Sequence, residues 1–155
     1  MPGFTGRDTV GWGGKPGDGI NGWSARALHI SNPDFVQMGY YVYHVDQPPK
    51  WGSEWKWGWG AQRKMESEKW YRIDEYVKIN EIDKSDGILR AWVDDKLVFE
   101  KTTVKFRTVP GLKVKGYWFN VYEGGEWTAT QDMDVYFDDL VISSKPTGKN
   151  NVLAK

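Results

Sequence analysis

Apolar and polar residues alternate along several short segments of this chain. In the longest of them, Tyr71, Ile73 and Val77 fall on one face and Arg72 falls on the other. A period of two is typical of β-strands, and no segment keeps the 3.6-residue period of an amphipathic helix. The pattern predicts strands at residues 24–30, 39–45, 70–79, 88–93, 96–100, 114–122 and 134–142.

Turn residues separate these segments. Asp94-Asp95 lies between two of the predicted strands and predicts a two-residue hairpin, because aspartate tolerates the positive φ that such turns require. Residues 31–34 predict another turn. Residues 1–22 are rich in glycine and predict turns, and residues 50–69 predict a long Trp/Gly/Lys loop.

Many short strands between turns predict an all-β fold, an antiparallel β-sandwich or jelly roll of the concanavalin-like kind. The 155 residues are enough for a single domain with one core. We expect this domain to cover residues 1–142 and residues 143–155 to form a polar C-terminal tail.

Charge and composition narrow the function classes. Lys+Arg and Asp+Glu both total 21, so the chain lacks the basic excess of a nucleic-acid binder. It has no cysteine, no zinc spacing and no phosphate-binding loop, so we expect no metal and no cofactor. No leader opens it, and no apolar run is long enough for a membrane helix, so we expect no membrane contact. Its location stays open between the cytoplasm, a virus particle and action outside the cell.

The chain contains ten Trp, eight Tyr and eighteen Gly. Two interpretations of the tryptophans stand side by side: packing in a β core, or stacking on the C–H faces of sugars. Among them, Trp55, Trp57 and Trp59 lie in the predicted long loop, where they are candidates for sugar-stacking walls.

The candidate chemistry lies on two neighbouring predicted strands. Ser24 and Arg26 are two residues apart and therefore share a face, as do Tyr41 and Tyr43. A guanidinium matches the geometry of a carboxylate, and a phenol transfers protons if nearby cations lower its pKa from about 10. These groups suit an acidic sugar. His44 points the other way from Tyr43 and is expected to be structural.

The chain resembles family 14 of the polysaccharide lyases, the alginate and glucuronate-polymer lyases with a β-jelly-roll fold. The matching segments occur in family order over nearly the whole chain. They are Pro2–Phe4, Asn21–Arg26, Tyr41–Pro48, Trp70–Arg72, Val77–Asn80, Asp86–Asp94, Lys96–Val98, Phe106–Arg107, Phe119–Gly125 and Phe137–Ile142.

The resemblance implies a β-jelly roll and a site made of Ser24, Arg26, Tyr41 and Tyr43. It also implies a catalytic lysine shortly before the Pro-Gly segment. Only Met1 precedes that segment here, so we expect this lysine to be absent, and Lys15 is a candidate substitute and substrate-binding residue. An absent opening strand would leave a sheet edge for another chain to cover.

Several functions remain open at this point. The first is recognition of an acidic polysaccharide, a uronate polymer such as alginate, with or without cleavage by β-elimination. The second is a non-catalytic structural or decoration protein of a virus or phage particle, with self-association or the particle surface as its contact. The third is a lectin-like sugar binder. An exposed Trp cluster favours sugar binding, and Trp side chains buried between subunits favour assembly.

Overall fold

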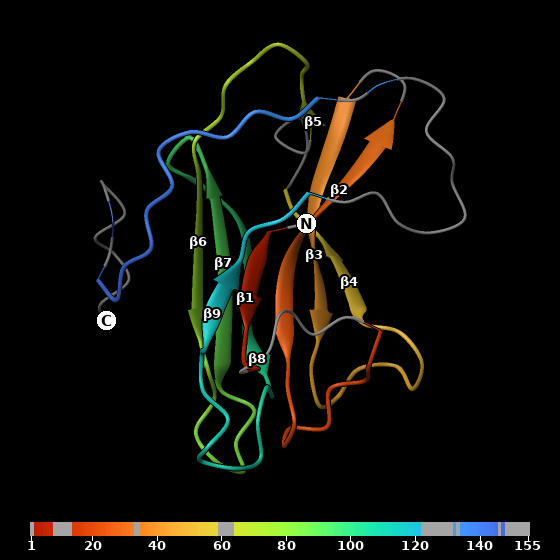
Figure 1. The fold of residues 1–155 in the computed structure, drawn as a ribbon, viewed down its shortest axis with the longest axis vertical. Coiled ribbons are helices and arrows are strands. Elements are labelled where there is room, and N and C mark those ends of the chain that lie inside the picture. Colours follow the sequence, from red (N-terminus) through yellow and green to blue (C-terminus); the bar gives the residue numbers. More distant parts are fainter. Residues whose placement is uncertain are drawn as a thin grey trace.

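A computed structural model describes residues 2–7, 14–32, 35–58, 64–121, 132, 134–145 and 147. These residues form nine strands in two antiparallel sheets and contain no helix. A membrane-spanning helix is accordingly not found in this part of the chain. The expected all-β sandwich is confirmed (Figure 1).

The larger sheet has the strand order β4-β3-β2-β1-β9, with β5 also paired to β3. Its long central strands, β2 and β3, pair over nine residues each from Ser24↔Tyr43 to Asn32↔Phe35. The strands of this sheet are β1 (Gly3–Thr5), β2 (Ser24–Asn32), β3 (Phe35–Tyr43), β4 (Ser53–Lys56), β5 (Lys64–Met65) and β9 (Gly116–Trp118).

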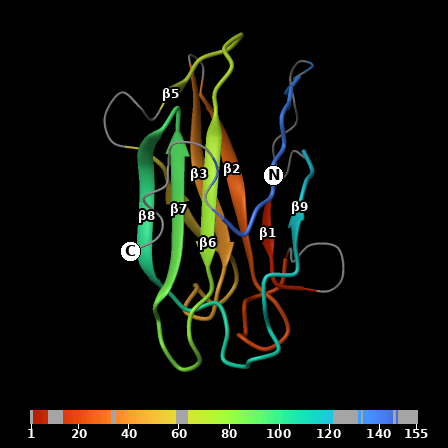
Figure 2. The same ribbon diagram turned by 90° about the vertical axis from the view of Figure 1, so that its left-hand side faces the viewer.

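The smaller sheet consists of β6 (Ile73–Lys78), β7 (Gly87–Val93) and β8 (Lys96–Val104), in that order. It lies in front of β2 and β3 in Figure 2. Asp94 and Asp95 join β7 to β8 with φ values of 48° and 65°, which confirms the predicted two-residue hairpin.

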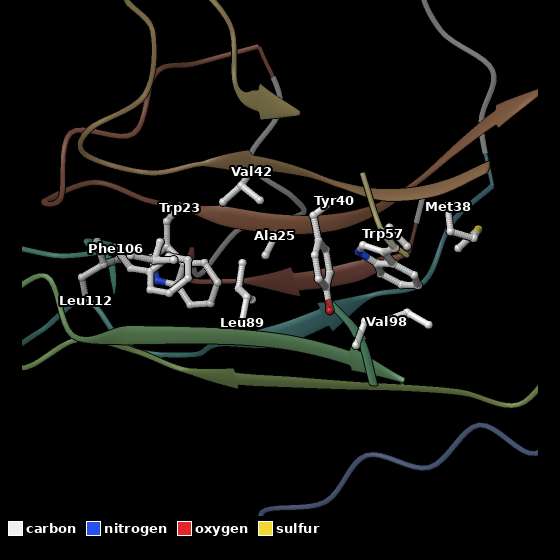
Figure 3. Packing of buried hydrophobic residues seen from close by; sticks show 13 residues of the cluster. Trp23, Ala25, Met38, Tyr40, Val42, Trp57, Leu89, Val98, Phe106 and Leu112 are labelled. Atoms are coloured by element: carbon white, nitrogen blue, oxygen red, sulfur yellow. The ribbon is translucent and has the colours of Figure 1, made fainter. Parts of the chain in front are cut away.

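The core fills the space between the sheets, where the alternating apolar positions of both layers meet (Figure 3). Trp23 packs on Phe106 at one end, with ring centroids 4.6 Å apart, and Tyr40 packs on Trp57 further along, at 4.8 Å. Large aromatic side chains bury the most area per residue, so they dominate the stability of this small sandwich.

Some strands differ from those predicted. Among the described residues of 134–142 there is no strand, and Val135, Tyr136 and Leu140 are exposed. An alternating segment forms a strand only where a sheet edge accepts its backbone hydrogen bonds, which sequence alone does not show. Strands β1, β4 and β5 were not predicted, because two to four residues are too few to display a period.

Hydrogen bonds close the sandwich along both of its sides. On one side, the Gly58 N–H after β4 donates to the Val98 carbonyl of β8 at 2.6 Å. On the other, the Tyr117 hydroxyl of β9 donates to Oε2 of Glu75 in β6 at 2.7 Å. Oε1 of Glu75 is also buried, without a hydrogen-bond partner among the described residues. Burial raises the pKa of Glu75 to about 7, while the hydroxyls of Tyr117 and Tyr40 oppose the rise.

Glu75 should therefore make folding pH-dependent. Its folded pKa of about 7 exceeds the ordinary 4.5, so its stabilising contribution is complete below pH 4.5 and is lost as pH rises to about 7. Between pH 4.5 and about 7, we expect the free energy of unfolding of Glu75→Gln to rise by about 3 kcal/mol relative to that of the wild type. Urea unfolding of both proteins from pH 4 to pH 8 measures this difference in free energy. The other carboxylates contribute equally in both proteins, so their contributions cancel. A difference that stays constant with pH would contradict the expectation.

Asn80, which is fully buried, ties two loops together, the one between β6 and β7 and the one after β8. Its Oδ1 accepts the backbone N–H groups of Phe106 and Arg107, at 2.8 and 3.0 Å. Its Nδ2 donates to the carbonyls of Glu81, Lys84 and Arg107. One amide side chain thus satisfies five backbone groups that would otherwise lack a partner.

Asn80→Ala should therefore lower the free energy of unfolding by about 3–5 kcal/mol, because several backbone groups lose their partners at once. The matched control is Asn21→Ala, whose exposed amide bonds to Asp18 and whose loss should cost under about 1 kcal/mol. Chemical denaturation measures both. Equal effects of the two variants would show that Asn80 does not organise the loops.

Candidate functional site

The outer face of the larger sheet carries two rows of side chains that cross its strands. The pairing register places Trp118, Gly3, Arg26, Tyr41 and Glu54 opposite one another on β9, β1, β2, β3 and β4. We call this the arginine row. Because paired residues share a face, all four side chains point away from the core.

The second row, which we call the serine row, contains Gly116, Thr5, Ser24 and Tyr43. The two rows bring all four predicted site residues onto one face of two neighbouring strands. The residues between them, such as Ala25 and Val42, are fully buried in the core, as the alternation requires.

Three aromatic rings surround the Arg26 guanidinium. Its central carbon lies 5.9 Å from the ring centroid of Tyr41, 5.7 Å from that of Tyr43 and 5.4 Å from that of Trp118. Cations favour the faces of aromatic rings, most of all that of tryptophan. The rings therefore hold a positive charge at a defined place in a low-dielectric setting, where an anion would interact with it strongly.

Gly3 explains how Trp118 approaches Arg26 across the strand between them. A Cβ at Gly3 would lie 2.5 Å from the Arg26 Cα, and closer still to the Ala25 carbonyl oxygen. Only a residue without a side chain fits here. Because Gly3 has no side chain, the space between Trp118 on β9 and Arg26 on β2 stays open.

Both phenol oxygens accept backbone hydrogen bonds. The Gly14 N–H donates to Tyr43 at 3.0 Å, and the Gly52 N–H donates to Tyr41 at 3.1 Å. The two rings meet edge to face at 5.4 Å. Burial and then the neighbouring Tyr43 hydroxyl raise the pKa of Tyr41, although the Gly52 N–H and Arg26 act to lower it. Arg26 therefore does not lower the pKa of Tyr41 below its ordinary value, because desolvation prevails.

The site is closed in this structure. Exposure is 0% for Ser24, 5% for Arg26 and 2% for Tyr43, whereas Tyr41 is half-buried. Residues next to the long strands, including Gly14 and Gly52, lie against the two phenols. A ligand arriving from solvent would therefore contact Tyr41 first, and its access to Arg26 requires movement of a covering segment.

Lys15 lies beside the site. It directly follows Gly14, whose N–H contacts Tyr43, and its own side chain is exposed. This places a second cation at the edge of the serine row, as expected if Lys15 contributes to substrate binding.

Trp55 and Trp57, two of the tryptophans predicted to stack on a sugar, lie on the core side of the larger sheet. Trp57 is 2% exposed and packs on Tyr40 in the core. Trp55 pairs with Tyr40 on the core side of β4 and stacks on Phe99. Trp57, which follows β4, therefore has no exposed face to stack on a sugar, and Trp55 lies on the core side of β4. Trp59 lies outside the described residues.

His44 faces the core side, away from Tyr43. Its Nε2 lies 2.9 Å from the Ser53 hydroxyl, and its ring lies 5.1 Å from that of Trp55. Burial lowers the pKa of His44, as does the charge of Lys101. These contacts agree with a structural role.

Two cavities among the described residues lie away from the arginine row. One of about 320 Å³ lies between the segment after β1 and the loop before β9, lined by Arg7, Asn21 and Lys115 among others. Another, of about 230 Å³, is lined by Lys64, Tyr71 and neighbouring residues. Within the described residues, no group of three acidic or histidine side chains is placed to hold a metal ion.

Sequence reasoning missed Trp118 and the structural role of Gly3. Trp118 belonged to a predicted strand, and Gly3 to a segment that matched the family. Neither observation shows which strands are neighbours, and β1 lies between β9 and β2 only in the folded sheet.

Gly3→Ala should destabilise the protein by at least about 2 kcal/mol, because the new methyl group meets the backbone of β2 and must push β1 away. Gly116→Ala is the matched control: Gly116 lies on neighbouring β9 and has open space around the added Cβ. Thermal and chemical unfolding measure both. Similar stabilities for the two variants would show that the close approach at Gly3 is not required.

Comparisons with known proteins agree with this fold. The chain is similar to alginate lyase Aly36B, with a TM-score of 0.68 and 22% identity over 82% of this chain and 52% of that one. A mutant of that lyase in complex with an alginate tetrasaccharide gives the same values, and another with an alginate trisaccharide gives 0.59 and 23% over 72% and 46%. Identities this low show the fold.

The chain thus spans about half the length of these lyases. A search of curated proteins gave no match. The family model for polysaccharide lyase 14, in contrast, matches residues 1–140. This match covers nearly the whole sequence and both rows of the site, and the chain therefore belongs to polysaccharide lyase family 14.

Proposed function

We propose that the chain binds a uronate polymer of the alginate type on the outer face of its larger sheet and cleaves it by β-elimination. The observation that carries this proposal is the register of β2 and β3. It brings the central carbon of the Arg26 guanidinium to 5.9 Å from the ring centroid of Tyr41 and 5.7 Å from that of Tyr43. Membership in a polysaccharide lyase family supports the reaction type. The alginate lyases with the same fold support the substrate class.

The reaction has three requirements. The negative charge that spreads onto the uronate carboxylate must be stabilised when C5 loses its proton. A base must accept that proton, and the electron pair forms the C4–C5 double bond. An acid must protonate the oxygen that leaves C4.

Arg26 meets the first requirement, since its planar fork binds a carboxylate through two parallel hydrogen bonds. Its buried position makes the attraction stronger than it would be in water. Lys15 lies at the rim and supplies a further positive charge to an incoming polyanion.

The two phenols meet the other requirements. We assign proton abstraction to Tyr43, whose oxygen already accepts the Gly14 N–H that would stabilise a phenolate. Tyr41 keeps its proton because its pKa is raised, which suits the acid that protonates the leaving oxygen. We assign to Ser24, which lies opposite Tyr43 in the serine row, the orientation of the sugar by hydrogen bonding.

Binding without cleavage is the second candidate, because Tyr41 is half-buried and within reach of a ligand, whereas Tyr43, the proposed base, is 2% exposed. The particle-decoration and lectin alternatives receive no support from the comparisons.

Absorbance near 235 nm, the band of unsaturated uronate products, tests the proposal with alginate and glucuronan as substrates. We expect activity in the wild type and a loss of at least about 100-fold in Tyr43→Phe, because removal of a general base or acid costs this much or more. Tyr76→Phe is the matched control. Tyr76 lies on β6 beneath Arg90, far from both rows, and should keep full activity.

The outcomes separate the candidates. Full activity in Tyr43→Phe would contradict its role as base. Absence of product from the wild type, together with measurable affinity for uronate oligomers by calorimetry, would favour binding without cleavage. Absence of both would overturn the proposal.

A further inference from the structure

We propose that Glu75 is a positioning residue for the site: by accepting the Tyr117 hydrogen bond, it holds edge strand β9 so that Trp118 stays against Arg26. Its effect on substrate rests on the proposed function above. The attachment of the strand does not depend on it and is tested separately.

Strand β9 is weakly held by its backbone. It has three residues, and among the described strands its one partner is β1, itself three residues long. So short a ladder supplies few hydrogen bonds, and a strand of this kind needs side-chain contacts to remain in register. Figure 2 shows β9 beside β1, at the margin of the sandwich.

The strongest side-chain contact of β9 goes to the other sheet. Tyr117 points inward, meets Phe4 edge to face at 5.1 Å and donates its hydroxyl proton to Glu75 at 2.7 Å. Glu75 lies within β6, which is paired along its whole length with β7. The Tyr117 hydroxyl thus ties the edge strand to a firmly paired strand of the other sheet.

A carboxylate between the sheets is costly and unnecessary for packing. A leucine would fill this space without the desolvation penalty, and Oε1 of Glu75 finds no hydrogen-bond partner in the part of the chain that the structure describes. The Tyr40 hydroxyl lies close enough to Glu75 to affect the pKa of that carboxyl, but it donates its own proton to the Arg90 carbonyl. What Glu75 does have is the bond from Tyr117.

The consequence appears on the opposite face of the same strand. Successive residues of a strand point to opposite faces, so the side chain after Tyr117 points outward. That residue is Trp118, whose ring lies 5.4 Å from the Arg26 guanidinium. Glu75 and Arg26 are thus connected through two adjacent residues, and release of Tyr117 would loosen the ring that confines the carboxylate-binding cation.

Two variants break the bond and one preserves it. Tyr117→Phe removes only the hydroxyl, Glu75→Leu removes the acceptor, and Glu75→Gln keeps an amide oxygen that accepts the same proton. Hydrogen–deuterium exchange of residues 116–118 reports strand attachment, and KM for alginate oligomers reports the site.

We expect the exchange rate and KM to rise about 10-fold in Tyr117→Phe and Glu75→Leu, as for the loss of one buried hydrogen bond. Both should stay within about twofold of the wild type in Glu75→Gln. Partial unfolding lowers apparent kcat by reducing the number of active molecules and leaves KM unchanged. Val98→Ala provides that comparison: it opens a cavity in the core at β8 and should leave KM unchanged.

Unchanged exchange at residues 116–118 in Tyr117→Phe and Glu75→Leu would overturn the proposal. So would a KM that stays at the wild-type value while exchange rises, since Trp118 would then not act on Arg26. A wild type without uronate activity would refute the proposed function alone, and the exchange experiment would still decide whether Glu75 holds β9.

Discussion

The antiparallel register of β2 and β3 is the constraint on which the rest of this structure depends. It joins nine residue pairs, and it places Arg26 opposite Tyr41 and Ser24 opposite Tyr43. A slip of β2 by one residue would turn Arg26 into the core and bring Ala25 out to the other face. The hydrophobic pattern that builds the core therefore also builds the site, because the two use alternate residues of the same strands.

The surroundings of the Arg26 guanidinium offset part of the cost of burying its charge. A guanidinium with only 5% exposure would be expensive to desolvate if its surroundings were aliphatic. Here the faces of three aromatic rings surround it, and they return part of the lost hydration through their quadrupoles. The same burial raises the pKa of Tyr41 against the influence of the cation, so proximity to a positive charge does not by itself activate a phenol.

The two sheets are joined differently on their two sides. Backbone groups make the contact on one side, between Gly58 and Val98. On the other side two side chains make the contact, the Tyr117 hydroxyl and Glu75. A side-chain contact of this kind depends on protonation and on single residues, so the edge that carries Trp118 is the side of the sandwich most open to adjustment.

The sequence by itself determined the fold class, the long strands, the Asp94–Asp95 hairpin and the pairing of Ser24 with Arg26 and of Tyr41 with Tyr43 on common faces. All of these follow from the two-residue period or from local turn chemistry, which extend over a few neighbouring residues. Only the tertiary structure decided that Trp118 joins Arg26 across Gly3, that Trp57 belongs to the core and that residues 134–142 contribute no strand among those described. These depend on which strands become neighbours, and strand order is set by contacts between distant residues that no local pattern contains.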